Sequence, residues 1–163
     1  MNLKPKAHFN KITDIPIDFF KSNKIKGVII DVDNTIMDLD LNVLDGIYDW
    51  IDKLKKNNIK ICIASNSIKP SKIKNNKNFN GIPYVFLSLK PLKRGLVKSR
   101  KILNLKSNEI AEIGDQILTD VLGANRLGMY SILTDPLSPE KTAYGKLKRK
   151  IESNYKSKLK IKW

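Results

Sequence analysis

KGVIIDVDNT, residues 26–35, is the stretch that decides the fold of this chain. Its first part, residues 26–31, is a short, mainly apolar run rich in β-branched residues, which predicts a strand buried on both faces of a sheet. Its second part is polar and carries two carboxylates two positions apart, Asp31 and Asp33. Side chains two positions apart on an extended chain point the same way, so these carboxylates are expected to lie side by side beyond the strand.

Short apolar runs alternate with longer amphipathic segments along the rest of the chain. Further strands are predicted at residues 59–64, 82–87, 110–114 and 130–133, and helices at residues 43–56, 70–76, 92–103 and 117–127. Strands that alternate with helices in this way indicate an α/β fold, with a central parallel sheet of about five strands covered by helices on both faces.

The ends of the chain are less regular than its middle. Residues 1–24 are expected to form a lead-in segment with a short helical piece near residues 17–21, and residues 139–163 a basic C-terminal helix. Without an internal repeat or a Ser/Gly-rich linker, the 163 residues are expected to form one domain, residues 1–163.

Polar residues follow the predicted strands at the points where they end. The second predicted strand is followed by Ser65 and Asn66, the third by Lys90, and the fourth by Asp115 and Asp120. Ligands of parallel α/β sheets bind beyond the carboxyl ends of the strands, so these groups are expected to converge with the first two carboxylates. Each feature alone is more typical of a turn, a helix cap or a surface lysine. Their occurrence in order, at successive strand ends, favours a catalytic site.

The chemistry of this set points to phosphoryl transfer. Carboxylates crowded around one point repel each other unless a cation lies between them, and oxygen ligands without His or Cys suit Mg²⁺. With the phosphate oxygens neutralised, Asp31 can attack phosphorus as the nucleophile, and Asp33 can move the proton of the leaving oxygen. The predicted metal ligands are Asp31, Asp33, Asp115 and Asp120, and the predicted phosphate-binding residues are Thr35, Ser65, Asn66 and Lys90.

The same residues resemble the motifs of the haloacid dehalogenase (HAD) superfamily. Residues 31–35 resemble its first motif, Ser65 its second, Lys90 its third and residues 114–120 its fourth, so the resemblance spans residues 26–136. Ser65-Asn66, Lys90-Pro91 and residues 123–129 are similar, more narrowly, to the YqeG-type branch of subfamily IIIA, although Ser67 stands where that branch usually has a second Asn. The resemblance implies a Rossmann-like fold and a Mg²⁺-dependent phosphatase with an aspartyl-phosphate intermediate. Similar eukaryotic proteins imply phosphatidylglycerophosphate as the substrate.

The intervals between the motifs are too short for a separate cap domain. Residues 35–65 hold one loop and one predicted helix, and residues 65–90 hold a short helix and a strand. A site without a cap suits a phosphate carried on a membrane lipid, a protein or a nucleic acid, although small capless phosphatases also act on soluble metabolites.

Charge and composition limit the partners without choosing one. The net charge of +15, from 31 basic and 16 acidic residues, indicates attraction to an anionic substrate, nucleic acid or membrane surface. The single cysteine, Cys62, and the absence of both a secretory signal and an apolar run of about 20 residues indicate a cytoplasmic protein. Peripheral contact with the inner face of the membrane is compatible with this location.

The C-terminal segment has two interpretations. Its apolar residues recur every four positions among lysines, at Leu147, Ile151, Tyr155, Leu159 and Trp163. Such a basic amphipathic helix either lies on anionic lipid or packs its apolar stripe on the domain.

Three functions therefore compete. The leading hypothesis is a lipid phosphomonoesterase that acts on phosphatidylglycerophosphate. The second is a phosphatase for a soluble sugar phosphate, nucleotide or phosphoprotein. The third is a nucleic-acid or ribosome-binding protein with a vestigial site, which the charge favours. The intact set of carboxylates and lysine argues against the third hypothesis, as does the lack of aromatic residues interleaved with the charged stretches.

Overall fold

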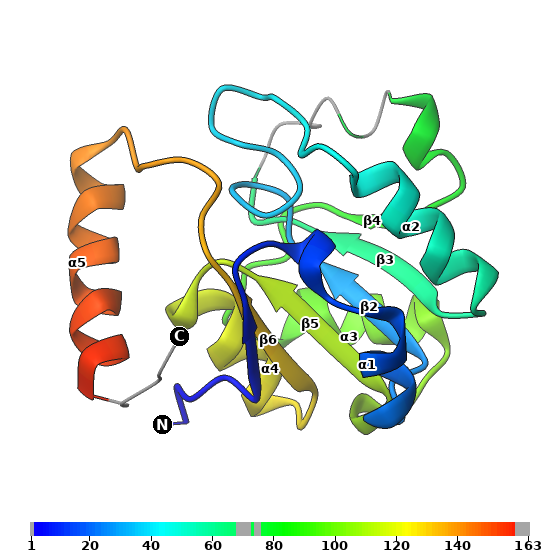
Figure 1. Ribbon diagram of the computed structural model, residues 1–163. Helices are drawn as coiled ribbons and strands as arrows, with labels where there is room; N and C mark the ends of the chain where they lie inside the picture. Colours follow the sequence, from blue (N-terminus) through cyan, green and yellow to red (C-terminus); the bar gives the residue numbers. More distant parts are fainter. Residues whose placement is uncertain (1, 68–72, 74–75, 159–163) are drawn as a thin grey trace.

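The computed structural model describes residues 2–67, 73 and 76–158. Its centre is a six-stranded sheet in the order β1-β6-β5-β2-β3-β4, in which all neighbouring strands are parallel (Figure 1). The strands are β1 Ala7–Phe9, β2 Gly27–Ile30, β3 Lys60–Ala64, β4 Tyr84–Val85, β5 Ile110–Gly114 and β6 Tyr130–Thr134. The α-helices are α1 Ile17–Ser22, α2 Ile47–Lys56, α3 Lys93–Leu103, α4 Leu122–Arg126 and α5 Ala143–Lys158. A π-helical turn, Ile117–Val121, leads directly into α4.

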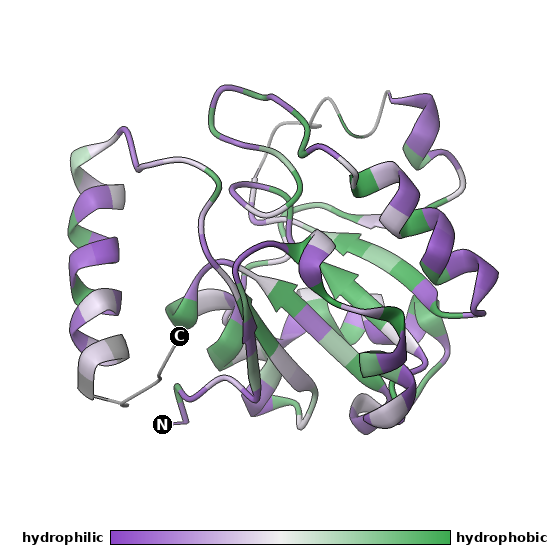
Figure 2. Ribbon diagram, viewed as in Figure 1, coloured by the Kyte–Doolittle hydropathy of each residue, from purple (hydrophilic) through white to green (hydrophobic). Residues whose placement is uncertain are grey.

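The two faces of the sheet carry separate apolar cores. β2 and β5 lie in the middle of the sheet and are buried along their whole length, as their mainly apolar sequences predict (Figure 2). The core on one face joins Val28 and Ile30 to Phe20 of α1 and Ile51 of α2. The core on the other face joins Ile29 to side chains of α3 and α4. This is the predicted α/β arrangement, with helices on both faces.

The sheet has one strand more than the predicted number of about five. β1 lies in the segment predicted as a lead-in, and it pairs with β6 through Ala7 and Ile132. It is a half-buried edge strand of three residues, so it lacks the apolar run that marks the central strands. The helical piece predicted near residues 17–21 is confirmed as α1.

Several element boundaries differ from the prediction for local reasons. The helix predicted from residue 43 begins at Ile47, because Gly46 has a φ of 78° and ends the preceding loop in the left-handed region. The strand predicted at residues 82–87 is confined to Tyr84–Val85. The helix predicted at residues 70–76 falls largely outside the described residues, as do the last residues of the predicted C-terminal helix.

The chain between the first two motifs contains a loop and α2, and no further folded unit. The loop returns on itself through bridges from Met37 to both Asp33 and Val43. Across the part of the chain that the structure covers, none of the helices is both long enough and apolar enough to cross a bilayer.

Candidate active site

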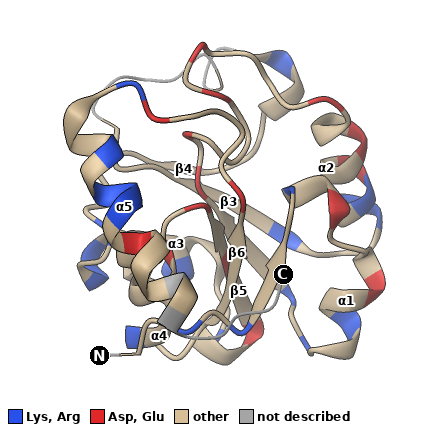
Figure 3. Cartoon of the chain, turned by 60° about the vertical axis from the view of Figure 1, so that its left-hand side comes forward, with Lys and Arg blue, Asp and Glu red and all other residues tan. Residues whose placement is uncertain are grey.

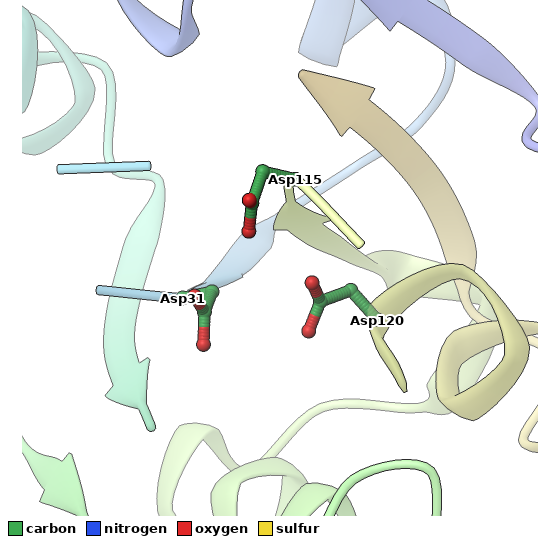
Figure 4. A group of neighbouring side chains, drawn as sticks. All are labelled: Asp31, Asp115 and Asp120. Atoms are coloured by element: carbon green, nitrogen blue, oxygen red, sulfur yellow. The ribbon is translucent and has the colours of Figure 1, made fainter. Parts of the chain in front are cut away.

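Three carboxylates meet at the carboxyl end of the sheet. Asp31 follows β2 and Asp115 follows β5, and these two strands are neighbours. Asp120 lies in the π-helical turn. All three side chains point toward a shared volume (Figure 4), and each offers one oxygen within 4.8 Å of the others. The three residues are buried, with exposed fractions of 7%, 0% and 2%.

A glycine makes this close approach possible. The carboxylate of Asp120 lies against the backbone of Gly114, so a Cβ at position 114 would come within 2.3 Å of the Asp120 Cγ atom. The Asp120 Oδ2 atom also accepts a hydrogen bond of 3.0 Å from the backbone N–H of Gln116. The Gly-Asp pair that ends β5 therefore sets the position of the whole acidic group.

Lys90 is the buried cation at the centre of the site. Its ammonium donates to Asp31 Oδ1 at 2.7 Å and to the carbonyl oxygen of Ala64 at 3.0 Å. It also pairs with Asp120 Oδ1 at 2.8 Å and Glu112 Oε1 at 3.2 Å. Burial alone would lower the pKa of Lys90, but the three carboxylates together raise it well above its ordinary value. Lys90 therefore stays charged.

Asn66 holds the loop that delivers Lys90. Its side-chain oxygen accepts hydrogen bonds from the Ser88 hydroxyl at 2.7 Å and the Lys90 N–H at 2.8 Å. Its side-chain nitrogen donates to the Lys90 carbonyl oxygen at 2.9 Å. Gly95 lets α3 approach the same loop, since a Cβ there would lie 2.2 Å from the carbonyl oxygen of Ser88. The amide of Asn66 thus positions Lys90, and its predicted contact with phosphate stays a prediction.

Asp33, Ser65 and Thr35 lie around the same strand ends. Burial raises the pKa of Asp33, Glu140 adds to the rise, and Lys90 and a hydrogen bond from Ser65 oppose it. The buried Ser65 hydroxyl also accepts the N–H of Ser67 at 3.0 Å. Thr35 is buried, and its hydroxyl has no hydrogen-bond partner among the described residues. The structure therefore brings Asp33 and Ser65 together beside Lys90.

The acidic group carries more negative charge than the protein neutralises. Burial raises the pKa of Asp31 from 3.8 to about 7, with further contributions from Asp120 and Asp33, while Lys90 opposes the rise. Burial also raises the pKa of Asp115 well above its ordinary value, assisted by Asp120 and Asp31. The Asp115 Oδ1 atom is buried and has no hydrogen-bond partner in the described part of the chain. Such a set of oxygen atoms fits a divalent cation.

The sequence analysis missed two members of the site. Glu112 lies in the middle of β5, fully buried against Lys90, and burial raises the pKa of its carboxyl well above the ordinary value. A charged residue inside a buried strand was the available signal, because such a group is costly without a partner. Arg149 of α5 pairs with Asp115, and this contact brings the helix to the strand ends (Figure 3). Nothing in the sequence separated Arg149 from the lysines around it.

Two family models match the chain. One is described as mitochondrial PGP phosphatase and matches residues 1–85, and the other is described as HAD-hydrolase-like and matches residues 90–136. The probable phosphatase YqeG of Bacillus subtilis (strain 168) is 31% identical over 159 residues, which cover 97% of this chain and 92% of that protein.

Solved structures share the fold at lower identity. NagD from E. coli K-12 is 11% identical with a TM-score of 0.56, and the match covers 72% of this chain and 90% of NagD. A possible sugar phosphatase of the HAD superfamily from Cytophaga hutchinsonii ATCC 33406 is 14% identical with a TM-score of 0.55, covering 83% of this chain and 93% of that one.

The acidic strand ends, the buried lysine and these matches agree with the family resemblance of the motifs. A phosphatase acts on a phosphorylated substrate. The site combines the ammonium group of Lys90 with three carboxylates, which are groups that phosphoryl transfer uses. The chain therefore belongs to the family of the mitochondrial PGP phosphatase model within the HAD superfamily, and it is a phosphatase of the YqeG type.

Proposed function

We propose that the protein is a magnesium-dependent phosphomonoesterase that forms an aspartyl-phosphate on Asp31 and converts phosphatidylglycerophosphate to phosphatidylglycerol. The observation that carries the chemical part is the buried Asp31 carboxylate, held by Lys90 and flanked by Asp115 and Asp120. A nucleophile in this setting can meet a phosphoryl group whose charge is already neutralised.

In the proposed reaction, a carboxylate oxygen of Asp31 attacks phosphorus, and the bond from phosphorus to the ester oxygen breaks. Asp33 gives its proton to the leaving oxygen, a role that the raised pKa of Asp33 supports. Asp33 then takes a proton from the water that attacks the phosphorus of the intermediate, which releases phosphate and restores Asp31. Lys90 and Ser65 bind the phosphoryl oxygens throughout. Mg²⁺ held by Asp31, Asp115 and the backbone carbonyl of Asp33, with Asp120 beside it, would supply further neutralisation of the phosphate charge.

A lipid substrate is favoured by three features of the chain. The family model over residues 1–85 is described as a PGP phosphatase, and the net charge of +15 suits an anionic surface. One face of α5 adds to this support, because Tyr144, Leu147 and Ile151 remain exposed there and line a pocket with Lys90 and Thr119. Peripheral contact of this face with an anionic membrane is part of the proposal.

A substrate panel tests this function. Phosphatidylglycerophosphate in mixed micelles should be hydrolysed with a higher kcat/KM than glycerol 3-phosphate, sugar phosphates and nucleotides. EDTA should remove the activity, and added Mg²⁺ should restore it. A soluble phosphate as the best substrate would overturn the lipid assignment and leave the phosphatase chemistry intact. Full activity in EDTA would overturn the metal dependence.

A further inference from the structure

The helix α5, Ala143–Lys158, reaches the acidic group although it lies outside the ranges matched by both family models. Its Arg149 donates through Nη1 to the backbone carbonyl oxygen of Asp115 at 2.8 Å, and its Nη2 pairs with the Asp115 Oδ2 atom. One guanidinium therefore contacts both the main chain and the side chain of a proposed metal ligand.

Two glutamates hold the guanidinium in this position. Arg149 Nε donates to Glu140 Oε1 at 3.1 Å, and Arg149 Nη1 donates to Glu152 Oε2 at 3.3 Å. Glu152 is only 2% exposed, and its other oxygen accepts the backbone N–H of Leu118 at 3.1 Å. The contacts of Arg149 and Glu152 thus connect α5 to the preceding segment, to Asp115 and to the π-helical turn.

The two oxygens of Asp115 have different surroundings. Oδ2 is engaged by Arg149, whereas Oδ1 is buried and has no hydrogen-bond partner among the residues that the structure describes. Contact of the guanidinium with Oδ2 and with the Asp115 carbonyl oxygen fixes the plane of the carboxylate. The unengaged oxygen is then available to the cation shared with Asp31 and Asp120.

The charges around Arg149 are compatible with a metal ion nearby. Arg149 contributes one positive charge, and Glu140 and Glu152 contribute two negative charges at its donors. Arg149 together with Glu140 and Glu152 therefore does not repel a cation overall. The N–H groups of Arg149 hold Asp115 in one orientation. Partners that orient a metal ligand in this way commonly change metal affinity by about 10–100-fold when they are removed.

We infer that Arg149 is a positioning residue of the metal centre: it fixes Asp115 for metal binding and makes α5 part of the active site. The inference rests on the proposed metal-dependent function. It assigns to α5 a role in metal affinity that is separate from contact with a membrane.

Isothermal titration of the full-length protein with Mg²⁺ tests the inference. Arg149→Ala should weaken Mg²⁺ binding by about tenfold or more, and Arg149→Lys should weaken it less, because an ammonium keeps the charge but not the paired donors. Lys150→Ala is the matched control, since it makes the same change of charge on the exposed side of the same helix. It should leave the affinity unchanged.

A second readout separates positioning from a loss of structure. The kcat of Arg149→Ala should recover at high Mg²⁺ concentration, and its melting temperature in EDTA should stay near that of the unmodified protein. Unchanged Mg²⁺ affinity in Arg149→Ala would overturn the inference alone. Tighter binding would also overturn it, because the guanidinium would then compete with the ion for Asp115. No Mg²⁺ binding by the unmodified protein would overturn the proposed metal dependence and this inference together.

Discussion

Replacing Asp31 by Asn is expected to stabilise the metal-free fold while it removes the nucleophile. Without a metal ion, Asp31 shares its buried site with Asp115, Asp120 and Glu112, and Lys90 contacts only some of these carboxylates. Burial is the largest reason that the pKa of Asp31 rises from 3.8 to about 7. An amide of the same shape removes both the cost of burying the charge and the repulsion.

The size of the effect follows from this pKa. A rise from 3.8 to about 7, at about 1.4 kcal/mol per pKa unit, sets an upper limit of roughly 4 kcal/mol at pH 8. This limit already includes the ion pair with Lys90, which lowers the pKa of Asp31. Relaxation of the surroundings reduces the cost of a buried charge, so the expected net gain is about 1–3 kcal/mol. For a domain of this length, that corresponds to a rise in melting temperature of roughly 3–10 °C.

The pH dependence gives the sign of the effect. Because the folded-state pKa of Asp31 is raised, the protonated carboxyl stabilises the fold fully below about pH 4, and this contribution is lost as the pH rises through about 7. The advantage of Asp31→Asn should therefore be largest at pH 8 and less than half as large at pH 5.

Thermal unfolding in EDTA at these two pH values measures the difference. Asp52→Asn on the exposed side of α2 is the control, and it should show no comparable gain at either pH. A lower melting temperature for Asp31→Asn at pH 8 would refute the reasoning, because the ion pair with Lys90 would then outweigh the burial of charge. An equal gain at both pH values would refute it as well.

Two further predictions concern the glycine that supports Asp120 and the exposed apolar residues of α5. Gly114→Ala should cut kcat at least tenfold and lower the melting temperature, because its Cβ would displace Asp120. Gly46→Ala is the control, since a Cβ there meets no atom within 4 Å. It should lower the free energy of unfolding by only about 1–2 kcal/mol, because of the positive φ, and kcat should be retained. Equal kcat in the two variants, measured with a small phosphate ester, would contradict the role of Asp120. The double change Leu147→Ser and Ile151→Ser should weaken binding to anionic vesicles and slow turnover of the lipid, while turnover of the small ester stays the same. Vesicle binding equal to that of the unmodified protein would exclude this face of α5 as the membrane contact.

Much of the sheet could be predicted because its central strands are buried on both faces. Such strands are mainly apolar, and the polar residues that follow them meet at one edge of the sheet. This reasoning predicts that Asp31, Lys90 and Asp115 lie together at the strand ends, and the structure places them there. The edge strand β1 was not predicted, because its three half-buried residues do not form an apolar run.

The orientation of α5 could not be predicted from its apolar period. The side chains of Leu147 and Ile151 in the predicted stripe are 58% and 41% exposed. The interpretation in which the stripe packs on the domain is therefore wrong for these two residues. Tyr155 does pack against an apolar cluster, and the helix is otherwise held by Arg149 and Glu152. Two of their partners, Asp115 and Leu118, lie 34 positions away in the sequence, and helical periodicity contains no information about them.

The contacts of α5 determine how the C-terminal segment should be tested. A deletion of residues 146–163 would remove Arg149 from Asp115 together with the exposed apolar residues. Loss of activity after such a deletion would not separate membrane contact from support of the metal centre. Substitutions at Leu147 and Ile151 leave the contacts of Arg149 in place, so they are the sharper test.

The most direct test of the central claim is to find the phosphoryl group on the protein during turnover. The unmodified protein and the Asp33→Asn variant would be mixed with substrate and Mg²⁺, quenched in acid within the first turnover, and mapped by peptide mass spectrometry. The account predicts one added phosphoryl group on Asp31, at higher occupancy in Asp33→Asn, because Asp33 activates the water that removes it. A phosphoryl group on any other residue, or an unmodified Asp31 in both proteins during rapid phosphate release, would contradict the mechanism.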